Sequence, residues 1–288
     1  MNLKEKLKNH DNWYYALKNK KVIIGFSIFL FFLILALLAP ILTKFDYEEI
    51  AGAPYSSPSL EHLMGTTIFG RDVFTQVLYG LRSTFFVGLV GGTIALVIGV
   101  LLGFISGYKS GTLLDEGLMM LTNILLVIPV IAILIILSAY LPYRGILVQS
   151  IIIGITSWPW SARAVRAQTL AIKNKEFVNL SRISSVPTLK IIIEDIASNM
   201  FSYVFMVYIL QFAGAILTAV GLDFIGLGPT RGISLGLIMQ NAVNWNALPL
   251  GLWWWAILPG LILTVLVTSL YFINTGLDEV FNPKLREM

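Results

Sequence analysis

The sequence contains no cysteine, and only 12% of its 288 residues are charged. Without cysteine the chain has no disulfide, no thiol nucleophile and no thiolate metal site. The charged fraction is about half that of ordinary soluble domains, whereas the hydrophobic fraction is 57% and the mean hydropathy is +0.80. These values exclude an ordinary soluble protein and indicate a membrane protein with little mass outside the bilayer.

Titratable side chains are missing from the apolar windows of the chain. Transporters driven by protons or sodium usually keep Asp, Glu, His or Lys inside the membrane, and these windows hold none of them. The two histidines, His10 and His62, fall outside the windows, where we expect solvated side chains. No GxxxxGK[ST] loop occurs, and GYKSGT at 107–112 has the wrong spacing, so we expect no ATP site in this chain. Energy for transport would then come from a partner.

Charge-free windows mark six predicted membrane spans, because a charge at the centre of a bilayer helix costs about 2.5–3.5 kcal/mol on insertion scales. A helix needs roughly 20 apolar residues to cross the hydrocarbon core. Residues 232–277 carry no charge, but 232–249 is polar enough that we predict a loop or a re-entrant piece there. The predicted fold class is all-α, a polytopic membrane protein with about six transmembrane helices. The windows are 22–43, 83–108, 117–141, 145–162 running on to about 166, 197–221 and 250–275.

The basic residues indicate which side each loop occupies. If the N-terminus is cytoplasmic, the inner segments hold 15 of the 20 Lys and Arg residues, and the positive-inside rule places both termini in the cytoplasm. The WWW cluster at 253–255 would then lie near the outer interface, as an aromatic belt rather than a stacking surface for a ligand. The predicted organisation is a cytoplasmic segment 1–21, a first span 22–43, an extracytoplasmic loop 44–82, a transmembrane core 83–277 with a cytoplasmic loop 167–196, and a cytoplasmic tail 278–288.

Small residues and prolines within the spans predict how the helices pack. Gly91, Gly99, Gly103 and Gly107 recur within the second span, and small residues at such spacing let two helices approach closely. We therefore predict helix packing there rather than a pore lining. Pro129 in the third span and Pro259 in the sixth are expected to kink their helices.

The stretch KNKEFVNLSRISSVPTLK, residues 173–190, is a polar island in this apolar chain. Phe177, Leu180 and Ile183 recur at three-residue spacing, which predicts a short amphipathic helix that ends before Pro187. Such a helix on the cytoplasmic face needs a cover for its apolar side. A membrane surface and a partner protein both fit this composition.

The island resembles the coupling-helix motif of binding-protein-dependent ABC importer permeases, in which Glu-Ala-Ala precedes a glycine and a downstream Leu-Pro. Aligned on KEFV, the Glu-Ala-Ala positions are Asn179, Leu180 and Ser181, and the glycine position is Ser185. All of these signature residues are substituted. Because serine lacks the easy left-handed backbone of glycine, we expect the turn after the helix to differ from the family's turn.

A second resemblance lies before the second span, in HLMGTTIFGRDVFTQVLYGLRS at 62–83. It is similar to the corresponding segment of the C-type permease subunit of dipeptide and oligopeptide importers. From the residues themselves, Arg71 beside Asp72 is expected to pair locally. The resemblance continues, in the same order, at 107–130, 222–229 and 276–287. The matching residues are His62, Gly65, Thr66, Gly70, Arg71, Asp72, Gly80 and Arg82.

Together the resemblances imply half of a heterodimeric pore with type I ABC importer permease architecture, in a bacterial or archaeal cytoplasmic (inner) membrane. The implied partners are a second, B-type permease, two ATPase subunits that bind ATP and Mg, an extracytoplasmic solute-binding protein and the lipid bilayer. No nucleic acid, cofactor, metal or catalytic residue is expected in this chain. The implied ATPase-docking residues are Lys175, Glu176, Phe177, Asn179, Leu180, Ser181, Arg182, Ile183 and Ser185, with Glu176, Phe177, Leu180, Arg182 and Ile183 as the contact surface.

Several alternatives stay open from sequence alone. The subfamily resembles importers of peptides, oligosaccharides and metal chelates, and we rank them in that order because no intramembrane His or carboxylate is available for a metal. A stand-alone channel or secondary carrier would need no docking helix. A membrane enzyme is disfavoured, because Glu194 with Asp195 and Asp278 with Glu279 are sequential pairs that point about 100° apart on a helix.

Overall fold

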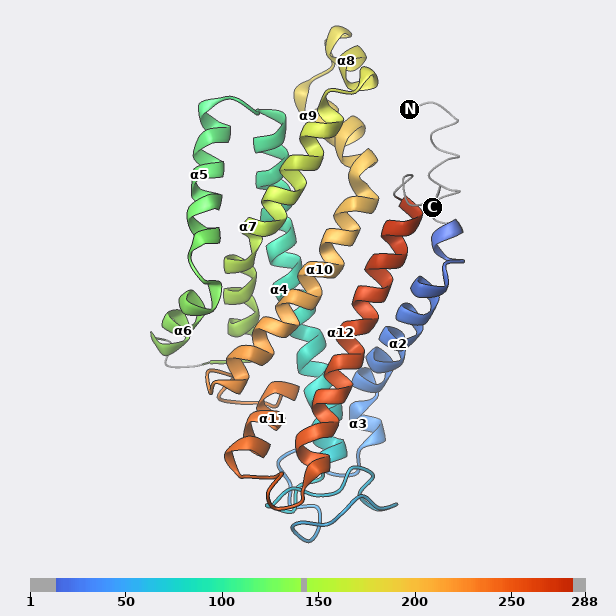
Figure 1. The fold of residues 1–288 in the computed structure, drawn as a ribbon, viewed down its shortest axis with the longest axis vertical. Coiled ribbons are helices and arrows are strands. Elements are labelled where there is room, and N and C mark those ends of the chain that lie inside the picture. The colour runs from blue at the N-terminus through green and yellow to red at the C-terminus, as the bar shows by residue number, and fades with distance from the viewer. Residues whose placement is uncertain (1–13, 141–143, 282–288) are drawn as a thin grey trace.

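The protein is a bundle of long helices, seen in a computed structural model that describes residues 14–140 and 144–281 (Figure 1). Most of the predicted cytoplasmic segments 1–21 and 278–288 lies outside these ranges. Within them the structure contains no strand, and the pairing of Thr66 with Asp72 is an isolated bridge. The elements are α2 Lys20–Leu37, α3 Ala39–Leu42, α4 Val73–Tyr108, α5 Leu113–Val127, α6 Val130–Tyr140, α7 Ile146–Lys173, α8 Glu176–Ile183, α9 Thr188–Lys190, the π-helix η1 Ile191–Ala197, α10 Ser198–Phe224, α11 Leu235–Asn244 and α12 Trp253–Phe281.

Four helices are long and apolar enough to cross a membrane: α2, α4, the continuous stretch Thr188–Phe224 that ends in α10, and α12. The pair α5 and α6 adds a fifth crossing if the two form one broken span. The helix α7 has 28 residues but is not among these helices. The all-α membrane fold is therefore confirmed, while the count of six spans stays a prediction.

The third predicted span differs most from its prediction. Where 117–141 was expected to be one kinked helix, α5 ends at Val127 and α6 begins at Val130, with an angle of 81° between them. Pro129 lies at this break, since proline cannot donate a backbone hydrogen bond and disfavours helical backbone in the residue before it. By contrast, Pro259 lies inside the uninterrupted α12.

Residues 232–249 are also more ordered than a loop. They contain α11, which begins after the cap residue Ser234, whose hydroxyl accepts a hydrogen bond from the backbone N–H of Leu237 at 3.1 Å. The helix packs against α10, α12 and α4. The alternative of a plain loop is therefore wrong for 235–244.

The second and fourth predicted spans form the closest helix pair of the bundle, α4 with α7. A Cβ placed on Gly99 would lie 2.0 Å from Ser161 Oγ, and one placed on Gly103 would lie 2.7 Å from the carbonyl oxygen of Ala162. The predicted role of these glycines in close helix packing is confirmed. We call this contact the α4–α7 seam.

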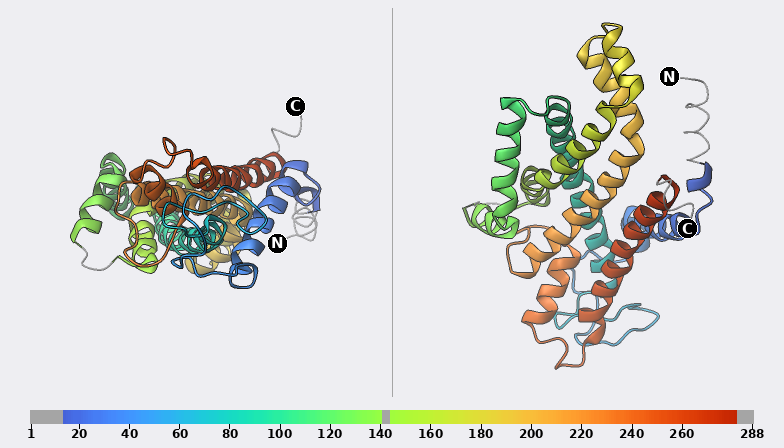
Figure 2. Two further views of the ribbon diagram at one scale, coloured as in Figure 1. Left: turned by 90° about the horizontal axis from the view of Figure 1, so that it is seen from below. Right: turned by 45° about the horizontal axis from the view of Figure 1, so that its top comes forward.

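The two ends of the bundle carry different elements. In Figure 1 the upper end holds α8, the α4–α5 turn, the start of α2 and the end of α12, whereas the lower end holds the 44–72 loop and α11. The right view of Figure 2 shows the same separation. Segments predicted to be cytoplasmic thus share one end, and segments predicted to be extracytoplasmic share the other.

Candidate functional site

The predicted coupling helix is present as α8, with Lys175 at its N-cap and Glu176 in its first turn. Its C-terminal turn is closed by two backbone hydrogen bonds, Ser185 N–H to Arg182 O at 3.0 Å and Val186 N–H to Ser181 O at 3.1 Å. This is the Schellman pattern, whose left-handed position usually holds glycine. Ser185 adopts that conformation, with φ of 57°, so the left-handed turn forms with serine in place of glycine, and a difference from the family's turn stays a prediction.

The side chains of α8 divide into an inner and an outer set. Val178 is fully buried in a cluster with Val165, Ile191 and Met200, against which Phe177 also packs. The predicted surface of Phe177, Leu180 and Ile183 is therefore split, because Phe177 belongs partly to this chain's own core. The apolar spacing did not predict that Val178 is buried, since a helix of eight residues is too short for the pattern to show which face points inward. Leu180 is 63% exposed and Ile183 is 81% exposed, and they form what we call the outer pair.

Two basic residues, one in α8 and one just before it, contact the end of α4. The guanidinium of Arg182 lies over the ring of Tyr108, 5.4 Å from its centroid, and donates to Asn179 Oδ1 at 3.2 Å. Lys173 Nζ donates to the carbonyl oxygen of Tyr108 at 3.0 Å and to the hydroxyl of Ser110. Burial, and then repulsion by Arg182, lower the pKa of the Lys173 ammonium. Arg182 is exposed while it makes these contacts, so its part in docking stays a prediction.

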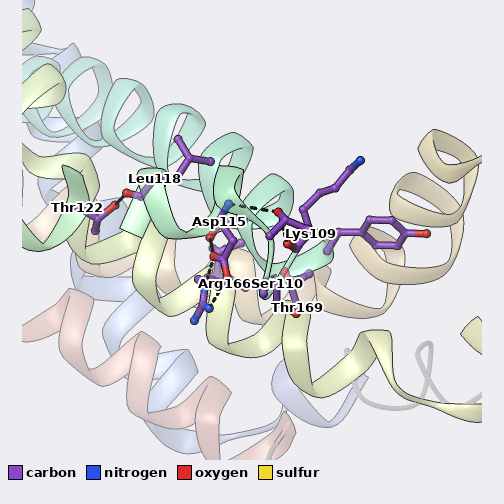
Figure 3. Close-up of polar contacts among 12 residues, drawn as sticks. Lys109, Ser110, Asp115, Leu118, Thr122, Arg166 and Thr169 are labelled. Atoms are coloured by element: carbon purple, nitrogen blue, oxygen red, sulfur yellow. Dashed lines mark hydrogen bonds and ion pairs between the residues drawn. The ribbon is translucent and has the colours of Figure 1, made fainter. Parts of the chain in front are cut away.

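A bidentate ion pair at this end of the bundle was not predicted. Arg166 on α7 donates from Nε to Asp115 Oδ1 and from Nη2 to Asp115 Oδ2, both at 2.8 Å (Figure 3). Asp115, in the first turn of α5, is 3% exposed and also accepts from the hydroxyl of Ser106 and from the backbone N–H of Gly111 at 3.0 Å. One carboxylate therefore joins α4, α5 and α7. The partners are 51 positions apart in the chain, and no local pattern pairs them.

At the opposite end, the family motif forms the fold of the 44–72 loop. His62 is 5% exposed, and its Nδ1 lies 2.9 Å from Asp72 Oδ1, so the expectation of a solvated His62 is wrong. Asp72 Oδ2 accepts the backbone N–H of Thr75 at 2.7 Å and so caps α4. Asp72 therefore pairs with His62, not with Arg71 as expected. The Arg71 guanidinium lies 5.7 Å from the ring centroid of Phe69, and its Nε has no hydrogen-bond partner among the described residues.

The remaining motif residues position this loop. Gly65 and Gly70 have φ of 67° and 72°, in the left-handed region that glycine adopts without strain. The backbone oxygen of Thr66 accepts the indole N–H of Trp254 at 3.1 Å, which attaches the loop to the start of α12. Gly80 packs closely against the start of α11, because a Cβ placed on it would lie 3.1 Å from the backbone nitrogen of Leu235. Arg82 is exposed on α4.

Only part of the WWW cluster can be an interfacial belt. Trp253 is 48% exposed, whereas Trp254 is 7% exposed and Trp255 is 2% exposed. The last two belong to the core that α12 shares with the outer loop and α11. The belt interpretation is therefore wrong for Trp254 and Trp255.

A buried carboxylate at the outer end of α10 was also missed as a site. Asp223 is 1% exposed and accepts from Gln149 Nε2 at 2.6 Å and from the hydroxyl of Ser234. It therefore links α10 to α7 and to the start of α11. Its segment, 222–229, carries the family resemblance, but only the fold shows which groups it bonds.

An apolar groove of about 450 Å³ lies between the α2 and α12 pair and α10, with Leu89 of α4 also in its lining. Near its end, Glu279 of α12 accepts from Asn19 at 3.1 Å and pairs with Lys21, which fixes the start of α2 to α12. The groove walls offer no charged group among the described residues. Its lining includes Ile23, Phe26, Phe205, Tyr208, Ile273 and Leu277.

Comparison with known proteins gives a consistent result along the chain. Residues 99–287 match the model of the family described as binding-protein-dependent transport system inner membrane component. Residues 10–59 match the N-terminal TM domain of oligopeptide transport permease C.

Individual relatives cover almost the whole chain. The dipeptide transport system permease protein DppC of Bacillus subtilis is 31% identical over 96% of this chain and 86% of that protein. The oligopeptide transport system permease protein OppC of Bacillus subtilis is 30% identical over 93% of this chain and 87% of that protein. The oligopeptide transport system permease protein OppC of Haemophilus influenzae is 32% identical over 93% of this chain and 86% of that protein.

Proposed function

This chain belongs to the family of binding-protein-dependent transport system inner membrane components, and from that membership we propose that it is the C-type permease subunit of an ATP-driven importer of dipeptides and oligopeptides. The relatives named above are peptide transport permeases of similar length. The chain forms half of the translocation pore. Oligosaccharide import by the same machinery remains the second candidate substrate class, since Trp160, Trp245 and Trp253 are exposed aromatic side chains.

We propose three kinds of protein partner in the working complex. They are a second permease of the B type, two ATPase subunits that bind and hydrolyse ATP with Mg, and an extracytoplasmic solute-binding protein. The complex lies in a bacterial or archaeal inner membrane with both termini of this chain in the cytoplasm. The basic residues around α8 support that orientation.

The single observation that carries the proposal is the outer pair of α8. Leu180 and Ile183 are large apolar side chains at the tip of the bundle, 63% and 81% exposed, and the inner face of the same helix is already buried. Exposed apolar side chains at a projecting helix fit a groove on a protein partner, which is the helix-in-groove mode of recognition. ATP binding closes the two ATPase subunits, carries α8 inward and turns the pore from outward-facing to inward-facing.

The first test removes the outer pair and leaves the inner face intact. We expect Leu180→Asp with Ile183→Asp to weaken ATPase docking by about 30-fold or more, because central apolar anchors in an interface contribute roughly 2 kcal/mol or more. The measurement is the amount of ATPase that co-purifies with tagged permease in mild detergent. Val178 and Phe177 keep their places, so the bundle itself is expected to keep its thermal stability.

A matched control is Leu113→Asp, which places the same charge at an 87% exposed leucine at the start of α5. That variant is expected to retain the ATPase. Intact, stoichiometric complex in the double variant would contradict the docking role of α8. Transport by the purified chain alone in liposomes would favour a stand-alone channel or carrier.

A further inference from the structure

The ion pair of Asp115 with Arg166 is the most completely bonded charged group at the cytoplasmic end. Both carboxylate oxygens and two guanidinium nitrogens take part, and the side chains are 5% and 27% exposed. Two parallel N–H···O bonds fix distance and angle together, which a lysine cannot do. The pair therefore holds the start of α5 on α7 in one orientation.

The same carboxylate also reaches the other arm of the α4–α5 hairpin. Ser106 of α4 donates its hydroxyl to Asp115, and the turn residue Gly111 donates its backbone N–H at 3.0 Å. Figure 3 shows these contacts gathered where α4, the turn and α7 meet. A single buried acid thus connects every element of this corner, and removal of either charged partner would leave the other buried without compensation.

The corner is continuous with α8. Lys173, the last residue of α7, donates to Tyr108 O and Ser110, and Arg182 of α8 lies over the Tyr108 ring. Val178 of α8 shares a core cluster with Val165 of α7. Along the α4–α7 seam a Cβ on Gly107 would lie 2.6 Å from Thr169 Cβ, so α4 and α7 are in close contact up to this corner.

On the opposite side, α2 packs on α4 and α12 packs on α10, but their described residues form no comparable network of charged groups. The start of α2 is fixed to α12 through Glu279, and the apolar groove lies between that pair and α10 with α4. A displacement of α8 therefore has a bonded route into α7 and α4, but across the groove it meets apolar side chains without directional bonds.

We propose that Asp115 and Arg166 are positioning residues that make α5 follow α8 during transport. This inference rests on the proposed function, in which ATPase subunits move α8. Without the pair, α8, α7 and, through the seam, α4 still respond to the ATPases, but α5 no longer moves with them. The result is ATP hydrolysis without import.

The test uses the assembled transporter with its binding protein in proteoliposomes, and compares ATPase activity with peptide uptake. For Asp115→Asn we expect uptake to fall about tenfold or more while ATPase activity stays within about twofold. Arg166→Lys keeps the charge and loses the bidentate geometry, and we expect the same split to a smaller degree. The matched control is Glu116→Gln, at the exposed neighbouring acid, with no change in either activity.

A distance measurement gives a second readout that a purely stabilising pair would not change. Spin labels on Leu113→Cys and Asn174→Cys report the separation of the start of α5 from the end of α7, and this chain has no other cysteine. In the otherwise native chain, we expect the distance between the two labels to be the same with and without trapped ATP. With Asp115→Asn added, the distance should shift or broaden between the two states.

The outcomes are separable. Wild-type complex without ATP-dependent uptake would defeat the proposed function itself. If the native complex works, then uptake retained in both variants, or uptake and ATPase lost in parallel, would overturn the positioning role. If Asp115→Asn does not assemble, Arg166→Lys with native uptake overturns it as well.

Discussion

At the scale of single residues, Ser185 shows how a turn can be kept without the residue that usually forms it. The left-handed conformation costs an L-residue about 1–2 kcal/mol relative to the right-handed one. Ser185 nevertheless has φ of 57°, because the turn provides two backbone hydrogen bonds and directs Val186 back toward the cluster around Val178. The local cost is thus offset by the closure of α8.

Replacement of Ser185 by glycine should therefore stabilise the turn. We expect a gain of about 0.5–1 kcal/mol, because glycine adopts positive φ without steric cost. Amide hydrogen exchange of Val186, whose N–H closes the turn, should slow by roughly two- to fivefold. The control is Ser184→Gly, one residue earlier at φ of −76°, where exchange should become faster. Equal effects of the two glycines would contradict this account.

The sequence indicated some residues of the outer-loop motif, but it did not indicate which side chains bond to one another. His62 and Asp72 were identified through the motif, but the expected partner of Asp72 was its neighbour Arg71. The structure selects His62, ten positions away, because the 44–72 loop folds back over the start of α4. Asp115 and Arg166 are further apart still. Pairing of this kind depends on tertiary approach, which local spacing does not encode.

At the scale of elements, the glycine spacing of α4 was an accurate guide. It predicted a close helix contact, and the structure identifies α7 as the partner. The break between α5 and α6 was less predictable, because Pro129 and Pro259 have similar apolar surroundings in the sequence. Pro259 lies in α12, which packs on both α2 and α11, whereas α6 packs only lightly on α7 and α10. Packing on neighbouring helices therefore keeps α12 continuous through Pro259, whereas the helix around Pro129 lacks that support and breaks.

Enlargement of a seam glycine should force α4 and α7 apart. For Gly103→Val we expect a loss of about 1–3 kcal/mol, because the new side chain meets the Ala162 backbone at 2.7 Å and Val165 Cβ at 2.8 Å. The measurement is the thermal midpoint of the purified complex, with Gly117→Val as control, since nothing lies within 4 Å of a Cβ at Gly117. A similar shift for both variants would show that helix propensity, not the seam, determines the effect.

At the scale of the whole molecule, hydropathy predicted the helices well and their number in the membrane less well. The predicted windows overlap α2 with α3, α4, α5 with α6, α7, α10 and α12. Helices extend beyond the windows where caps permit, as at Asp72, which starts α4 at Val73. The more polar α7 illustrates why composition alone leaves the count open: a helix covered by its neighbours does not need an apolar surface on every side.

The orientation of the bundle can be tested with thiol labelling in whole cells. We expect an impermeant maleimide to label Leu60→Cys, in the 98% exposed outer-loop position, in intact cells. Leu189→Cys, 69% exposed beside α8, should react only after the cells are permeabilised. The chain has no native cysteine to give a background signal. The reverse pattern would invert the assignment of sides.

The uninterrupted length of α7 sets how far its two ends are displaced when the helix tilts. With 28 residues at about 1.5 Å each, it is a rod of about 42 Å, and a sideways step of one helical pitch at the α8 end tilts it by only about 7°. The seam makes α4 share that tilt. If the far end, where Gln149 is hydrogen-bonded to Asp223, stays in place, the residues close to it are displaced much less than those at the α8 end.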